Sequence, residues 1–121
     1  MNHKIIFVDD EVSILKALKR DMTLADINAE YFVSAEDALG YLNQHRIGIV
    51  VSDLNMPGMD GITFLNEVQK KYPDIYRVLL SSTGVENLKL REALQNRTVE
   101  QCFDKPWDVN ELLAYFKGFK N

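Results

Sequence analysis

The chain of 121 residues has one cysteine and two histidines, and it contains no long hydrophobic run. Because Cys102 is the only cysteine, no disulfide can form within the chain, which fits a reducing compartment. No stretch of about 18 apolar residues is present, so we expect no membrane-spanning segment. The first apolar stretch is short and ends in acidic residues, unlike a signal peptide. Together these absences predict a cytoplasmic protein.

The charge and the length restrict the function classes further. A formal net charge of −4 argues against direct nucleic-acid binding by this chain. The hydrophobic content of 46% is ample for one core, and the length supports one domain, which we place at residues 1–121.

Strand-like and helix-like segments alternate along the chain without a long linker. Apolar, β-branched runs predict strands, and apolar residues at helical spacing predict helices. The predicted strands are 4–8, 29–33, 47–51, 75–80 and a short one around 102–103, and the predicted helices are 14–22, 34–42, 62–72, 90–96 and 108–116. Five such βα units predict an α/β fold with a parallel five-stranded sheet and helices on both faces. The flavodoxin-like, doubly wound order is the common solution at this size.

Charged side chains follow three of these strands. Asp9 and Asp10 come directly after the first strand, Asp53 follows the third, and Lys105 follows the fifth. In open α/β sheets, ligands bind at the carboxyl ends of the strands. Three carboxylates and one ammonium at that edge predict a site for a divalent cation and a phosphoryl group.

These residues, taken together, resemble a known family. The motif segments, each at a strand end, are Asp9-Asp10, Asp53, Met56-Pro57-Gly58-Met59-Asp60-Gly61, Ser81-Ser82-Thr83-Gly84 and Lys105-Pro106-Trp107. The chain is similar to the receiver domain of two-component response regulators over essentially its whole length. Each segment is weak evidence alone, whereas all of them in this order are highly specific.

The resemblance implies a role for each site residue. Asp53 would be the phosphoacceptor, a carboxylate nucleophile that forms an acyl phosphate. Asp9, Asp10 and Asp53 would hold Mg²⁺, which prefers oxygen ligands, with the backbone carbonyl of Asn55 as a further ligand. Lys105 would pair with a phosphoryl oxygen as a point charge. Such a domain is regulatory rather than an enzyme, because it catalyses only its own phosphorylation and dephosphorylation.

The resemblance also implies partners. His3 and His45 lie far from the motif segments in the sequence, so the donor histidine must come from another protein. That protein would be a sensor histidine kinase or a histidine phosphotransfer protein. A fused or separate output domain and a phosphorylation-dependent homodimer are both compatible with the family.

Two positions depart from the family pattern. The family places a Ser or Thr after the fourth strand; counting from Asp53 assigns that role to Ser81, and counting back from Lys105 favours Ser82. We prefer Ser81, because the next position should be small. The family usually has an aromatic switch residue where this chain has Cys102, which we expect to be a small buried hydrophobe. We expect Gly58 and Gly61 to be turn formers only.

Three other classes compete with this interpretation. A haloacid-dehalogenase-type phosphatase needs a general acid two residues after its nucleophile, where this chain has Asn55. A flavodoxin needs a phosphate-binding loop after the first strand, where Asp9, Asp10 and Glu11 would repel a phosphate. A pseudo-receiver that binds a partner without phosphorylation is the more serious alternative, although it would usually have lost a site residue.

Overall fold

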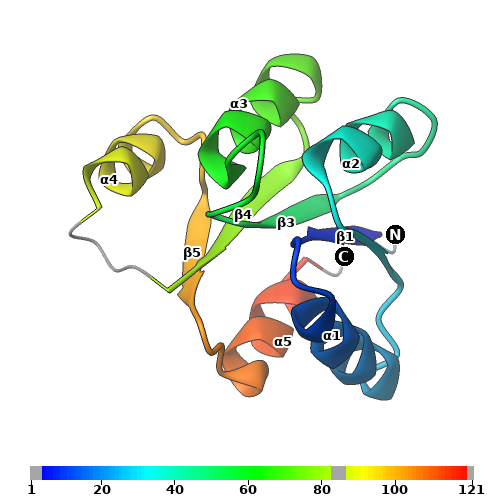
Figure 1. Cartoon of the computed structure of the whole chain (residues 1–121). Coiled ribbons are helices and arrows are strands. Elements are labelled where there is room, and N and C mark those ends of the chain that lie inside the picture. The colour runs from blue at the N-terminus through cyan, green and yellow to red at the C-terminus, as the bar shows by residue number, and fades with distance from the viewer. Residues whose placement is uncertain (1–3, 83–86, 120–121) are drawn as a thin grey trace.

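A computed structural model of the chain describes residues 4–82 and 87–119. The elements alternate as predicted (Figure 1). The strands are β1 (Ile5–Val8), β2 (Ala29–Phe32), β3 (Ile49–Asp53), β4 (Tyr76–Ser81) and β5 (Gln101–Asp104). The helices are α1 (Val12–Leu24), α2 (Ala35–Leu42), α3 (Gly61–Lys71), α4 (Leu88–Gln95) and α5 (Val109–Lys117).

The five described strands form one parallel sheet in the order β2-β1-β3-β4-β5. This is the flavodoxin-like order, so the predicted fold class is confirmed. The order reverses at β1, which lies between β2 and β3, and the crevice at such a switch point is where ligands bind in this class of sheet.

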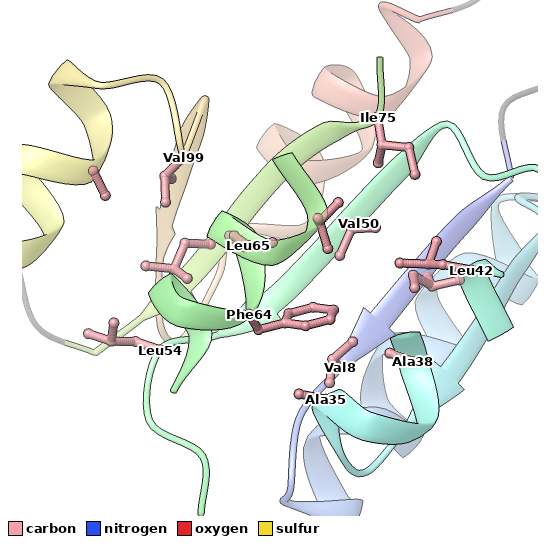
Figure 2. Packing of buried hydrophobic residues seen from close by; sticks show 14 of the residues in the cluster. Val8, Ala35, Ala38, Leu42, Val50, Leu54, Phe64, Leu65, Ile75 and Val99 are labelled. Atoms are coloured by element: carbon pink, nitrogen blue, oxygen red, sulfur yellow. The ribbon is translucent and has the colours of Figure 1, made fainter. Parts of the chain in front are cut away.

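Helices cover both faces of the sheet, as Figure 1 shows, with α1 and α5 on one side and α2 and α3 on the other. Alternate strand residues enter two separate cores. Ile6, Val8, Val50 and Leu79 pack with α2, α3 and α4. Figure 2 shows this core, in which Phe64 and Leu65 of α3 lie over β3 and β4. Burial on both faces explains why the strands are nearly continuous apolar runs rather than alternating ones.

Side-chain caps begin four of the helices. Ser34 and Asp108 each accept a hydrogen bond from a main-chain N–H in the first turn of α2 and α5, respectively. Asp60 and Asn87 do the same for α3 and α4. Each cap satisfies a donor that the helix itself leaves unpaired, which typically stabilises a protein by about 1 kcal/mol. The Asp60 cap also fixes where α3 starts after the loop that follows β3.

Two element boundaries differ from the predictions in a way that affects the site. β3 extends through Asp53, so that this acid is the last residue of the strand rather than a loop residue. β4 extends through Ser81, one residue beyond its predicted end. Both residues belong to their strands because their main chains pair with a neighbouring strand. A hydrophobic pattern in the sequence does not detect such pairing. Within residues 4–82 and 87–119, no helix is long and apolar enough to cross a membrane.

Arg77 is buried near the start of β4, at the opposite end of the strand from Ser81. Its guanidinium donates to the main-chain carbonyls of Ile75, Arg97 and Thr98 at 2.6, 2.9 and 3.1 Å. It also forms an ion pair with Glu100 at 3.2 Å. These bonds hold the segment between α4 and β5 against β4, and therefore help to set the register of the strand that leads to Lys105.

Candidate functional site

The three predicted acids meet at the carboxyl ends of β1 and β3. One carboxylate oxygen from each of Asp9, Asp10 and Asp53 lies within 4.8 Å of the others. β1 and β3 are paired neighbours, with Val8 opposite Ser52, and this register brings the residues that follow together. Asp9 and Asp53 are buried, at 2% and 7% exposure, whereas Asp10 is exposed. The cluster is therefore open to solvent on the Asp10 side.

Lys105 reaches into this cluster from the end of β5. Its Nζ donates to Asp9 Oδ2 at 2.8 Å and to Asp53 Oδ1 at 2.9 Å, and the lysine side chain is 13% exposed. The main-chain N–H of Lys105 also donates to the Ser81 carbonyl at 2.9 Å. The structure thus brings together four of the predicted site residues, which come at or just after the ends of three different strands.

The second oxygen of Asp9 is held as well. Asp9 Oδ1 accepts a hydrogen bond from the main-chain N–H of Glu11 at 2.9 Å, at the start of α1. Each oxygen of this buried carboxylate therefore has a donor. Asp9 is oriented by the backbone, and it in turn orients Lys105.

Burial is the largest influence on the pKa of Asp53. Burial raises the pKa of Asp53, and the nearby carboxylates of Asp9 and Asp10 raise it further, whereas the hydrogen bond from Lys105 opposes both. Burial lowers the pKa of Lys105, but its hydrogen bonds to Asp9 and Asp53 outweigh this, so that its pKa is raised overall. The single ammonium does not fully neutralise the acids, and a further cation would be bound favourably.

The donor set fits a magnesium ion. Mg²⁺ binds oxygen ligands at about 2.0–2.1 Å, so that ligands on opposite sides of the ion lie about 4 Å apart. The three carboxylate oxygens lie within 4.8 Å of one another, so only small side-chain movements would bring them to this spacing. Asn55, the further ligand predicted through its carbonyl, is exposed two residues after Asp53. Its role as a ligand stays a prediction.

The two candidate hydroxyls differ in environment. Ser81 is the last residue of β4 and is 1% exposed, whereas Ser82 follows it and is exposed. Thr83 and Gly84 of the same motif lie outside the described residues. Which serine contacts a phosphoryl group stays a prediction.

Cys102 lies on β5 opposite Leu79 and packs against the core beneath α2, α3 and α4. Cys102 was expected to be a small buried hydrophobe, but it is only partly buried, because it lies on an edge strand of the sheet. Burial, with a contribution from Asp104, raises the pKa of the thiol to about 11, so it is protonated at neutral pH. His45 is exposed and stacks on Tyr41, and His3 lies outside the described residues.

The residue that anchors the loop after Lys105 was not predicted from the sequence. Trp107 donates from its indole Nε1 to Asp21 Oδ2 on α1 at 3.3 Å. Trp107 belongs to the quoted motif, but nothing in the sequence links it to an acid 86 positions earlier. This contact connects the segment that carries Lys105 to the helix that follows Asp9 and Asp10.

Comparison with known proteins gives consistent matches. The family profile described as "Response regulator receiver domain" matches residues 5–117. The DNA-binding transcriptional regulator NtrC of Proteus hauseri is 33% identical over 110 residues, which cover 88% of this chain and 22% of that protein. The chain spans about a fifth of the length of the curated relatives it matches.

Two solved structures are similar over nearly the whole chain. The signal receiver domain of an HD domain-containing protein from Pseudomonas fluorescens Pf-5 has 26% identity and a TM-score of 0.88, covering 98% of this chain and 94% of that chain. A BeF₃-activated DrrB receiver domain has 27% identity and a TM-score of 0.82, covering 98% of this chain and 97% of that chain.

Proposed function

Because the chain belongs to the response regulator receiver domain family, we propose that it is a phosphoacceptor signalling domain in which Asp53 receives the phosphoryl group. The observation that supports this most strongly is the environment of Asp53. This acid ends a buried strand, its carboxylate lies 2.9 Å from the Lys105 ammonium, and two further acids lie beside it. A nucleophile, a cation and a metal-binding set are thus in one place. We propose that residues 1–121 form a single receiver domain.

In the proposed reaction, a carboxylate oxygen of Asp53 attacks the phosphorus of a phosphohistidine on a partner protein. An O–P bond forms, the P–N bond breaks, and the leaving imidazole nitrogen takes a proton. Phosphoryl transfer depends mainly on positioning and charge neutralisation. Lys105 would pair with a phosphoryl oxygen. Mg²⁺ would be held by Asp9, Asp10 and Asp53, together with the Asn55 carbonyl. The bound ion would neutralise charge on the phosphoryl oxygens.

The proposal extends to partners. We infer that a sensor histidine kinase or a histidine phosphotransfer protein donates the phosphoryl group, in the cytoplasm. The output would be an attached or separate domain, or a homodimer that forms on phosphorylation. Relatives such as NtrC of Proteus hauseri are transcriptional regulators much longer than this chain, which supports an output outside it. Catalysis by the domain would be limited to its own phosphorylation and dephosphorylation.

A pseudo-receiver that acts without phosphorylation is the alternative. The complete set of site residues favours the phosphoacceptor: Asp9, Asp10 and Asp53 are clustered, and Lys105 pairs with Asp9 and Asp53. A pseudo-receiver would have no need for an acid whose pKa is raised by burial and also by its acidic neighbours.

Beryllofluoride, a tetrahedral mimic of a phosphoryl group, separates the two functions. We expect ¹⁹F NMR to show a bound species with the parent chain only when Mg²⁺ is present, and none with Asp53→Asn. Asp26→Asn is the matched control, because Asp26 is exposed and its positive φ of 58° suits asparagine equally well. A parent chain that binds no beryllofluoride would support the pseudo-receiver instead.

A further inference from the structure

The main-chain carbonyl of Asp53 is enclosed on two sides. The hydroxyl of Ser52, which is fully buried, donates to this oxygen at 2.9 Å. Gly61, the first residue of α3, lies against it from the other side. A Cβ atom at Gly61 would lie 2.1 Å from the Asp53 oxygen and 3.0 Å from its carbonyl carbon. No side chain fits at position 61 unless the main chain moves.

The same glycine closes the loop between β3 and α3. The Gly61 N–H donates to the Leu54 carbonyl at 2.8 Å, and the Leu54 N–H donates to the Leu80 carbonyl at 3.2 Å. The loop therefore starts and ends at one point beside Asp53. Asn55, whose carbonyl is the proposed fourth ligand of Mg²⁺, lies inside it. The position of Gly61 thus affects both the nucleophile and the metal-binding loop.

Turn formation does not explain this glycine. Gly58 has a φ of +82°, which favours glycine, so the expectation of a turn former is correct there. Gly61 has no such φ, and the expectation is wrong at this position. The close approach to Asp53 is the remaining physical reason for a glycine.

We propose that Gly61, together with Ser52, is a positioning residue that holds the Asp53 main chain where the carboxylate can react and bind metal. This inference rests on the proposed phosphoacceptor function. Relieving the contact that a Cβ would make requires the backbone to move by about 1 Å, and a misplacement of that size can slow a reaction by about 10²-fold.

The test compares four variants of the 121-residue chain, each at a temperature where circular dichroism shows it folded. Acetyl phosphate labelling is followed by intact mass, and Mg²⁺ affinity is measured separately by calorimetry. We expect Gly61→Ala to slow labelling at saturating acetyl phosphate by about 10²-fold and to weaken Mg²⁺ binding. Ser52→Ala should change both in the same direction by a smaller factor.

Two controls separate positioning from stability. Gly40→Ala adds the same methyl group to a helix, where nothing lies within 4 Å, and it should label at the parental rate. Val68→Ala removes buried core contacts from α3 without touching Asp53, and it should lose stability but not Mg²⁺ affinity.

A folded Gly61→Ala that labels and binds Mg²⁺ like the parent would overturn the inference. If Gly61→Ala does not fold, Ser52→Ala decides: parental values overturn the inference, and reduced values support it. A parent that binds Mg²⁺ but is not labelled would instead refute the proposed function, and the Mg²⁺ affinities of the variants would still test the positioning role.

Discussion

Replacing Lys105 with methionine tests how strongly one ammonium stabilises the acid cluster. The lysine pairs with Asp9 and Asp53, both of which are nearly inaccessible to solvent. Removing one partner of a buried ion pair typically costs about 3–5 kcal/mol, because the remaining charge is left uncompensated. Because the site is open to solvent on the Asp10 side, water partly compensates the remaining charge. We therefore expect a loss of unfolding free energy at the low end of that range, about 3 kcal/mol. For a domain of this size, that loss lowers the melting temperature by about 12 °C.

The pH dependence of this loss identifies its cause. Asp53 already has a raised pKa in the folded state, and without Lys105 it should rise further. A carboxyl group with a raised folded-state pKa stabilises the fold fully below its unfolded value of 3.8 and loses that contribution as the pH rises through the folded value. The difference between variant and parent should therefore be greatest near neutral pH and should narrow as the solution becomes acidic.

Thermal melts without Mg²⁺ across this pH range make the measurement. Lys16→Met is the matched control, because Lys16 is exposed on α1, and its melting temperature should stay close to that of the parent. Adding Mg²⁺ should raise the melting temperature of Lys105→Met more than that of the parent, since the ion meets less compensated acid. A Lys105→Met variant as stable as the parent at neutral pH would refute the electrostatic argument.

Three further predictions concern the metal, the switch and the fold. Mg²⁺ at a concentration 100 times its Kd should stabilise the parent by about 2.7 kcal/mol and so raise its melting temperature. In thermal melts, Asp10→Asn should reduce that rise and should stabilise the metal-free chain. In sedimentation experiments, Ser81→Ala should bind beryllofluoride without the dimerisation or partner binding that follows in the parent. Cys102→Ala should keep most of that dimerisation or partner binding. If Ser81→Ala behaves like the parent, the switch role belongs to Ser82. Arg77→Met should lower the unfolding free energy by about 3 kcal/mol in urea titrations, because Glu100 loses its ion pair and four main-chain carbonyls lose the guanidinium that donates to them. An unchanged midpoint would contradict that role.

Much of the fold could be predicted from local pattern. Apolar runs and helical spacing located every described strand and helix, because both faces of the sheet are buried and each helix has one apolar side. The strand order came from the preference for this topology at this chain length rather than from the residues. Exact strand ends were missed at Asp53 and Ser81, where pairing with a neighbouring strand, rather than hydrophobicity, sets the boundary.

The site was predictable to the extent that topology alone brings strand ends together. Asp9, Asp10, Asp53 and Lys105 could be placed at one edge because all of them follow parallel strands. The Arg77 network and the crowding at Gly61 were not predicted. A single arginine within an apolar strand signals a buried partner, but the partners lie about 20 residues away in an irregular segment. The only sign in the sequence of a close approach between two main-chain segments is a glycine, and glycines also occur in turns.

The most direct test of the account is to locate the phosphoryl group on the chain. The parent is incubated with acetyl phosphate and Mg²⁺, the acyl phosphate is trapped by borohydride reduction, and the modified residue is mapped by peptide mass spectrometry. The account predicts modification at Asp53 alone, dependent on Mg²⁺ and absent from Asp53→Asn. Full labelling of Asp53→Asn, or modification of the parent at another residue, would contradict it.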